Sequence, residues 1–316
     1  MEHFAKDLQV ISPKRLRDLS QKSNKEGWIK TGSHIGAIIL NTALLSHFWG
    51  HWLGVVFFVI QGVLLACLYA GIHEFSHRTV FKTKELNDLF GRLFSFTILV
   101  CKSLDRSEHM EHHRYTQDLK KDAELIGTKP FTLTTYLLYV LGPSYWFIRI
   151  RELVYLTLGI NIWPYLSEKQ YKDAQREVRE NMVGYLIILI ISVWFQSWAA
   201  IQFWLLPLFI MKWVHQLQNI TEHTGMPNEA GILINTRTIK TNAVMRWLMW
   251  NMQYHTAHHL YPSVPFFRLP ALHQEIFGTL EKEPPTITYQ AFQWHMIRKL
   301  IADKSSRFCG RDVATY

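Results

Sequence analysis

Three short histidine clusters have the clearest capacity for chemistry in this chain. Two share the spacing H-x-x-H-H and one is H-x-x-x-H, and we call them the first, second and third boxes: His73 and His77; His109, His112 and His113; His255, His258 and His259. On a helix, positions i, i+3 and i+4 face the same side, so each box directs its imidazoles one way. Imidazole is the commonest metal ligand in proteins. We therefore predict that the three boxes, which hold eight of the sixteen histidines, meet at one metal centre.

The number and type of these ligands indicate the metal. Zinc sites use three or four protein ligands, whereas the boxes offer eight nitrogens, enough for two ions. The three cysteines, Cys67, Cys101 and Cys309, are far apart and form no C-x-x-C pair, so a thiolate zinc site is not indicated. Nitrogen ligands without thiolates favour redox metals, and iron is the one that activates oxygen in such a setting. The boxes therefore predict a site for two iron ions.

Three further polar residues share a helical face ahead of the third box. His215, Asn219 and His223 recur at i, i+4 and i+8. We predict that His223 is an additional metal ligand, and we interpret His215, which is closer to an apolar run, as a supporting or packing residue. Carboxylates beside the boxes could orient the imidazoles by accepting hydrogen bonds, although each is equally well explained as a solvated or salt-bridged group: Glu74, Glu111, Asp118, Asp122 and Glu222.

Four long apolar runs must position these residues. Hydrophobic residues make up 48% of the chain and gather in runs instead of an amphipathic period. About 20 apolar residues span the hydrocarbon core of a bilayer, and somewhat shorter runs do so with flanking aromatics. Two helical hairpins are predicted, from residues 33–49 with 52–72 and from residues 182–198 with 199–213. Two hairpins buried in a soluble protein are the alternative, but four such runs are hard to bury without lipid.

The basic residues test this topology independently. All 34 lysines and arginines lie outside the hairpin tips, with seven, ten, six and eleven of them in residues 1–32, 73–129, 149–179 and 212–316. An even number of crossings puts these segments on one side, which the positive-inside rule makes cytosolic. Topology and anionic lipid thus explain the net charge of +9, and no nucleic-acid partner is expected. The predicted fold is an all-α membrane protein with four transmembrane helices as two hairpins and a cytosolic helical cap that holds the histidines.

The same topology predicts three parts of the chain. Residues 1–32 form a cytosolic N-terminal arm with a short surface helix, residues 33–275 form the membrane-embedded domain, and residues 276–316 form a cytosolic C-terminal tail with an amphipathic helix. Two further apolar stretches, 86–104 and 130–148, are interpreted as interfacial or re-entrant helices, because a crossing there would separate the boxes. The protein is therefore expected to be an integral, multi-pass membrane protein with both termini and the metal site in the cytosol.

The three boxes, their order and the two hairpins resemble the membrane-bound fatty acid desaturase family over roughly residues 33–275. The resemblance implies a centre of two iron ions that uses O2 and two electrons to remove two hydrogens from an acyl chain of a lipid or thioester. The family's box histidines correspond to the eight named above. In the stearoyl-coenzyme A desaturases an extra ligand and a water-bridged asparagine precede the third box, and His223 and Asn219 match them. The first box has three intervening residues, as in many acyl-lipid desaturases.

The resemblance also implies an electron donor. The chain has neither an H-P-G-G haem signature nor a glycine-rich nucleotide fingerprint. Electrons are therefore expected from a separate ferredoxin or small cytochrome with its reductase. The bacterial inner membrane and the endoplasmic reticulum both fit the predicted topology.

Three other functions stay open at this point. Residues 260–270, with three prolines, resemble the segment that follows the third box in carotenoid ketolases and hydroxylases, so a di-iron hydroxylase or ketolase of an apolar substrate is the closest alternative. His73-Glu74-x-x-His77 is also an H-E-x-x-H motif, in which Glu74 would be the base of a membrane zinc metalloprotease. A non-catalytic metal-binding or lipid-binding membrane protein is the last alternative.

Overall fold

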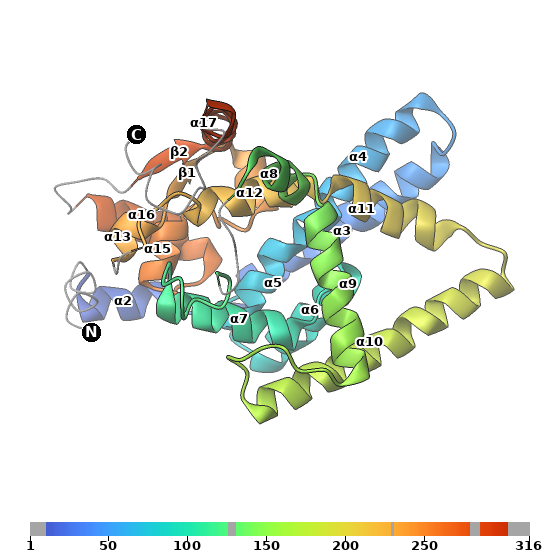
Figure 1. Cartoon of the computed structure of the whole chain (residues 1–316), viewed down its shortest axis with the longest axis horizontal. Helices are drawn as coiled ribbons and strands as arrows, with labels where there is room; N and C mark the ends of the chain where they lie inside the picture. The colour runs from blue at the N-terminus through green and yellow to red at the C-terminus, as the bar shows by residue number, and fades with distance from the viewer. Residues whose placement is uncertain (1–10, 126–130, 229–230, 279–284, 303–316) are drawn as a thin grey trace.

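Long helices at one end and a compact cap at the other make up the protein (Figure 1). The computed structural model describes residues 11–125, 131–228, 231–278 and 285–302. The long-helix end contains α3 (Asn24–His47), α4 (Trp52–Ala66), α5 (Leu68–His77), α10 (Glu168–Trp194), the π-helix η1 (Ile201–Leu205) and α11 (Leu206–Met211). The other helices are α2 (Pro13–Leu19), α6 (Lys84–Thr97), α7 (Lys102–Tyr115), α8 (Leu133–Val140), α9 (Pro143–Leu158), α12 (Trp213–His223), α13 (Ile232–Asn235), α14 (Ala243–Leu248), α15 (His255–Leu260), the 3-10 helix η2 (Phe266–Arg268), α16 (Leu269–Phe277) and α17 (Tyr289–Ala302).

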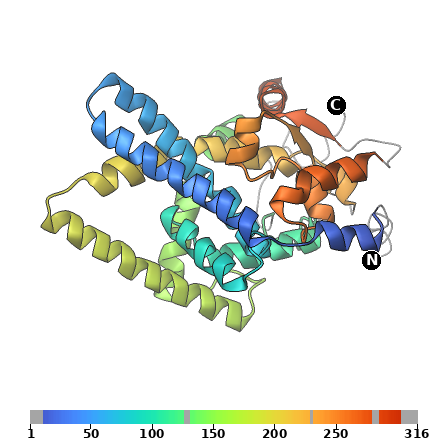
Figure 2. The same cartoon turned by 180° about the vertical axis from the view of Figure 1, so that it is seen from behind.

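The first hairpin turns at Gly50, between the predicted apolar runs 33–49 and 52–72. Gly50 has φ +85°, a left-handed conformation that glycine adopts without steric cost, and it lies between the end of α3 and the start of α4. The buried side chain of Asn41 donates to Gln61 at 2.9 Å, and Gln61 donates to the carbonyl of Phe203 at 3.1 Å. These bonds satisfy polar groups among apolar ones and join α3, α4 and η1. Figure 2 shows α3 running from the cap to the hairpin tip.

One helix among the described residues, the run Trp52–His77 formed by α4 and α5, is long and apolar enough to span a membrane. The other three predicted crossings fall on α3, the C-terminal half of α10, and η1 with α11. All three are helical, but α3 and α10 begin in polar sequence, and a π-helix precedes the short α11. The boundary predicted at residue 32 lies inside α3, because the N-cap Ser23 starts that helix at Asn24.

Gly62 lets α4 and α11 approach closely, which yields a test of the packing. A Cβ at Gly62 would lie 2.3 Å from Cγ of Met211 and 2.5 Å from the carbonyl oxygen of Pro207. We expect Gly62→Ala to destabilise the protein by about 1–3 kcal/mol, because the two helices must separate. Gly36→Ala on α3 is the matched control, since its Cβ would meet nothing within 4 Å and alanine favours a helix. Thermal unfolding of the detergent-solubilised protein measures both, and equal stability of the two variants would contradict the close contact.

The cap adds a feature that an all-α fold lacks. Strands β1 (Thr238–Lys240) and β2 (Thr286–Thr288) pair in parallel, with Ile239 opposite Ile287. The all-α prediction therefore needs correcting to a mostly helical fold with one two-stranded sheet. Both strands consist largely of β-branched residues, which suit a pleated surface, but three residues are too few to produce a recognisable period.

Both ends of the described chain pack against the cap. Leu19 of α2 is buried in the main core, and Arg15 donates to Glu275 of α16 at 2.8 Å. In α17, Phe292, Met296 and Leu300 are buried on one face, and α17 packs on α8 and α12. Of the predicted arm and tail, residues 1–10, 279–284 and 303–316, with Cys309, lie outside the described residues.

Candidate metal centre

Four helices bring nine histidines to one place, where α5 of the long-helix end meets the cap. The first box lies on α5, the second on α7, His223 at the end of α12, and the third box on α15. Their side chains form two adjacent groups, and within each group one ligand atom per residue lies within 4.8 Å of every other. The first group consists of His73, His77, His109, His113 and His258, and the second consists of His112, His223, His255 and His259. The structure thus brings together every histidine predicted as a ligand.

Helical spacing explains how the boxes divide between the groups. His109 and His113, at i and i+4, enter the first group, while His112 enters the second. The third box divides the opposite way: His255 and His259 enter the second group, and His258 enters the first. The rings of His113 and His259 are only 4.2 Å apart, centre to centre. Each H-x-x-H-H box therefore contributes to both groups.

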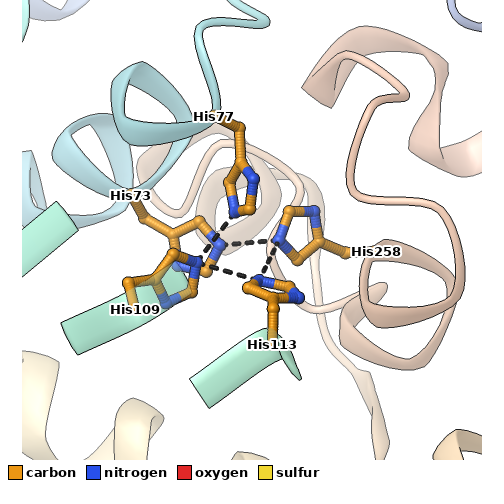
Figure 3. Close-up of side chains that lie close together, drawn as sticks. All are labelled: His73, His77, His109, His113 and His258. Carbon is orange, nitrogen blue, oxygen red and sulfur yellow. Dashed lines mark hydrogen bonds between the residues drawn. The ribbon is translucent and has the colours of Figure 1, made fainter. Parts of the chain in front are cut away.

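The nitrogen atoms of the first group converge on one point (Figure 3). The Nε2 atom of His109 lies 2.8 Å from that of His77 and 2.9 Å from that of His113. The Nε2 atom of His258 lies 2.8 Å from that of His73 and 3.2 Å from that of His113. An imidazole nitrogen has either one N–H or one lone pair, so it cannot satisfy two such neighbours at once. A cation at the shared point would satisfy them all.

Three imidazoles of the second group each have an oxygen atom that accepts a hydrogen bond from Nδ1. These hydrogen bonds decide which ring nitrogen keeps its lone pair. The Nδ1–H of His112 donates to Asp122 at 2.9 Å, and that of His223 to the backbone carbonyl of Asn235 at 3.1 Å. Nδ1 of His259 lies 3.2 Å from the Thr116 hydroxyl, which donates to the His112 carbonyl and so accepts from His259. A proton fixed on Nδ1 leaves the Nε2 lone pair free for a metal.

More distant carboxylates face other Nδ1 atoms. Oε1 of Glu124 lies 3.6 Å from Nδ1 of His109, and Oε1 of Glu222 lies 3.8 Å from Nδ1 of His255. Of the five carboxylates named from the sequence, Asp122 makes the direct contact, whereas Glu111 pairs with Arg114, and Asp118 accepts from the backbone of Lys120. The sequence reasoning missed Thr116, Glu124 and the Asn235 carbonyl, and a backbone carbonyl leaves no signal in residue type.

Burial sets the protonation of these imidazoles. Desolvation, with other histidines nearby, lowers the pKa of His109, His113 and His258 well below the usual range, and lowers that of His223 to about 3. Burial alone would also lower the pKa of His112, but Glu124 and the hydrogen-bonded Asp122 raise it to about 9. The neutral imidazoles have free lone pairs, and the negative field at His112 favours a bound cation as it favours a proton.

The donor set fits the two metal ions that the sequence predicts. Among the described residues, nine imidazoles converge without a thiolate, since Cys67 and Cys101 are buried elsewhere. The buried Nε2 of His259, on the side of the ring opposite Thr116, has no hydrogen-bond partner among the described residues. Unpaired buried nitrogens are costly unless something occupies the site. The residues present therefore suit nitrogen-binding metal ions.

Glu74 does not have the position of a protease base. Its side chain is fully buried, and its Oε2 accepts from the Thr79 hydroxyl at 2.9 Å. Its Oε1 lies 3.8 Å from Nδ1 of His258, behind that imidazole, and the backbone of Phe266 faces the same carboxyl group and offsets part of the rise in its pKa that burial causes. A base in an H-E-x-x-H zinc site must reach a metal-bound water. Glu74 instead supports His258 and the proline-containing segment after the third box.

The other two residues predicted near the metal lie outside both groups. The imidazole of His215 lies 3.2 Å from the Gln216 amide oxygen and packs at 4.4 Å against the ring of Tyr69, in keeping with its interpretation as a packing residue. The amide oxygen of Asn219 accepts from the Tyr139 hydroxyl at 2.9 Å. Its water-bridged role remains a prediction.

Helical architecture and histidine boxes gathered from several helices define a class of metalloproteins, and sequence comparison gives the family. The model of the family described as fatty acid desaturase matches residues 50–291, more than half of the chain. The chain therefore belongs to the fatty acid desaturase family, whose members are membrane-associated oxidoreductases.

Curated relatives are consistent with this family at low identity. The chain is 25% identical over 246 residues to a sphingolipid delta(4)-desaturase of Drosophila melanogaster, covering 74% of this chain and 71% of the relative. It is 21% identical over 326 residues to an sn-1 oleoyl-lipid 12-desaturase of Synechocystis, covering 92% and 88%. A fatty acid desaturase of Bacillus subtilis is 23% identical over 273 residues, covering 79% and 75%.

Proposed function

We propose that this protein is an O2-dependent di-iron desaturase that introduces a double bond into the acyl chain of a lipid or thioester. The observation that carries the proposal is the convergence of nine histidines in two adjacent groups of five and four. His73, His77, His109, His113 and His258 would hold one iron, and His112, His223, His255 and His259 the other. When bound, the irons supply the activation of O2 that is needed to remove hydrogen from an unactivated C–H bond.

The chain's own residues orient the ligands and exclude water. Asp122, Thr116 and the Asn235 carbonyl keep Nδ1 protonated on three imidazoles, so that Nε2 faces the centre. Five of the nine histidines are buried, and the other four are partly buried. Limiting water protects reactive species from side reactions. Asn219 is proposed to hold a water molecule near the second group.

Exposed apolar side chains support the proposed multi-pass topology. Trp194, at the end of α10, is 81% exposed, and apolar residues upstream on the same helix are also exposed: Val183, Leu186, Ile187, Leu189, Ile190, Ile191 and Val193. Trp52 and Val55 of α4 are exposed near the tip of the other hairpin. A water-soluble surface rarely has such a patch, whereas lipid would cover it. We propose four crossings by residues 33–213, with the N-terminal arm 1–32, the tail 276–316 and the metal site in the cytosol.

The proposed partners follow from the reaction. The printed names of the curated relatives concern sphingolipid, oleoyl-lipid and fatty acid desaturation, and we propose an acyl lipid or acyl thioester as the substrate here. Desaturation consumes two electrons, which a ferredoxin or small cytochrome with its reductase would deliver at the cytosolic face. The membrane would be a bacterial inner membrane or the endoplasmic reticulum.

Metal content and product analysis test the proposal together. We expect the purified protein to contain about two irons per chain, because the histidines form two groups and the proposed O2 chemistry needs a redox-active metal, which zinc is not. Incubated with a donor system, O2 and labelled membrane lipid, it should form a product two hydrogens lighter. Mass spectrometry with 18O2 separates the alternatives, since incorporation of oxygen without a new double bond would establish a hydroxylase or ketolase. One zinc per chain and no iron would contradict the oxygenase chemistry altogether.

A further inference from the structure

A cavity in the cap, distinct from the histidine groups, has the lining of an anion site. Its volume is about 310 Å³, and β1, β2, α14, α16 and the residues just before α15 line it. Thr238, Thr241 and Thr286 lie along it, together with the cations Lys240 and Arg246. Threonine hydroxyls and basic side chains are the donors that oxyanions prefer. None of the described residues that line it is acidic.

Gln253 presents a buried amide to this cavity. Its side chain is 2% exposed, and neither its amide nitrogen nor its amide oxygen has a hydrogen-bond partner among the described residues. Its backbone carbonyl accepts from Ile239 at 2.9 Å, so the residue is tied to β1. A buried amide with both ends unpaired is costly, and native proteins keep such groups chiefly where something else satisfies them. The missing partner must be both an acceptor and a donor.

The described residues that line the cavity carry a net positive charge at neutral pH. Burial lowers the pKa of His273, whose Nδ1 is also buried and without a partner among the described residues, to about 4. His273 is therefore neutral, and Lys240 and Arg246 supply two positive charges. Arg246 donates to the Thr241 carbonyl at 3.1 Å, which fixes one end of its guanidinium. The ring of Tyr254 packs against His273 at 4.9 Å and forms part of the wall.

We propose that this cavity binds a phosphate group at the polar end of the acyl substrate. Lys240, Arg246 and the Gln253 amide nitrogen donate to phosphate oxygens, and the Gln253 oxygen accepts from an N–H or O–H close to the phosphate. Because Gln253 stands two residues before His255, a polar end bound here has a fixed position relative to the second histidine group. The identity of the polar end rests on the proposed function, because that function makes the ligand an acyl substrate.

Two kinds of acyl substrate have a phosphate group at the polar end: a phospholipid, in its headgroup, and an acyl thioester, in its coenzyme A part. Full-length protein in the phosphate-free detergent dodecyl maltoside is titrated with glycerophosphoethanolamine or with desulfo-coenzyme A, and binding is measured by calorimetry. We expect one or both probes to bind. Arg246→Gln or Lys240→Gln should weaken binding about tenfold, because each removes a charge-assisted hydrogen bond. The preferred probe identifies the source.

Gln253→Met and Lys84→Gln make the test specific to the cavity. Methionine fills a similar volume without polar atoms, so Gln253→Met should weaken binding by about 3- to 10-fold while the unfolding temperature stays equal or rises. Lys84 is an exposed lysine of α6 that does not line the cavity, and Lys84→Gln should bind as the wild type does. Absence of binding by both probes, or unchanged binding in Arg246→Gln, would overturn the inference.

Binding is measured without turnover, which separates this inference from the proposed function. If the protein desaturates an acyl chain but Arg246→Gln binds the probes as the wild type does, the phosphate site alone is overturned. If Arg246→Gln loses probe binding but the wild type forms no desaturated product, the desaturase proposal is overturned and the phosphate site is supported. In the supporting case, Arg246→Gln raises the KM for the acyl substrate about tenfold and changes kcat little, because a contact to the polar end is the same in the ground state and the transition state.

Discussion

Replacement of His223 by glutamine is expected to reduce product formation by at least about a hundredfold. Removal of a partner that only orients a metal ligand typically costs about 10- to 100-fold, and loss of the ligand itself costs more. The Nε2 atom of His223 lies 2.7 Å from that of His255 and 3.2 Å from that of His112, so it occupies the middle of the second group. A glutamine amide offers no comparable nitrogen lone pair. Iron content should fall by about one ion per chain, measured by mass spectrometry of the purified protein.

His215 provides a matched control on the same helix. It is buried on α12, two turns before His223, but its imidazole contacts Gln216 and Tyr69 and belongs to neither group. We expect His215→Gln to retain iron and to have activity per folded protein close to that of the wild type. Equal losses of iron in both variants would show that His223 acts through the packing of α12 and not as a ligand.

Asp122→Asn is expected to lower iron affinity and activity by about 10- to 100-fold, although the replacement has the same size. The buried carboxylate accepts from three donors, which are Nδ1 of His112 and the backbone N–H groups of Gln117 and Glu124, each at 2.9–3.0 Å. The NH2 group of asparagine would face one of these three donors, and two donors cannot form a hydrogen bond with each other. It could also donate to Nδ1 of His112, which moves the ring proton to Nε2 and blocks the lone pair that faces the second group.

Asp118→Asn distinguishes this mechanism from a general change of charge. Asp118 belongs to the same loop, but its half-buried side chain accepts from the backbone N–H of Lys120, at 2.9 Å, and not from His112, which donates to Asp122. Iron titration and lipid product analysis should therefore find this variant close to the wild type. If Asp118→Asn lost as much iron as Asp122→Asn, the net charge of the loop would matter and the orientation of His112 would not.

The candidate site was largely predictable because helical periodicity is local. Spacings of three and four residues place side chains on one helix face whatever surrounds them, so the boxes and His223 were identifiable from the chain alone. The hairpin turn at Gly50 was predictable for a similar reason, since an apolar run ends there at a residue suited to positive φ. The short parallel sheet was not, because β1 pairs with a strand that begins 48 positions further along the chain.

Other features depended on contacts between distant residues. The choice of Asp122 over Asp118 as the partner of His112 follows from the path of the loop after α7, where Gln117 has φ +66°. The Asn235 carbonyl behind His223 and the support that Glu74 gives to His258 join segments far apart in sequence. Residue type and spacing contain no information about such pairs.

The sequence by itself determined which histidines are candidate metal ligands, because their spacing and the lack of paired cysteines are properties of the chain. The tertiary structure alone decided how the ligands divide. The second and third boxes have identical spacing, yet they send opposite members to the two groups, since α7 and α15 present their faces to the centre from different directions. It also placed Gln253, Lys240 and Arg246 around one cavity, because pairing of β1 with β2 and packing of α16 bring their separate segments together.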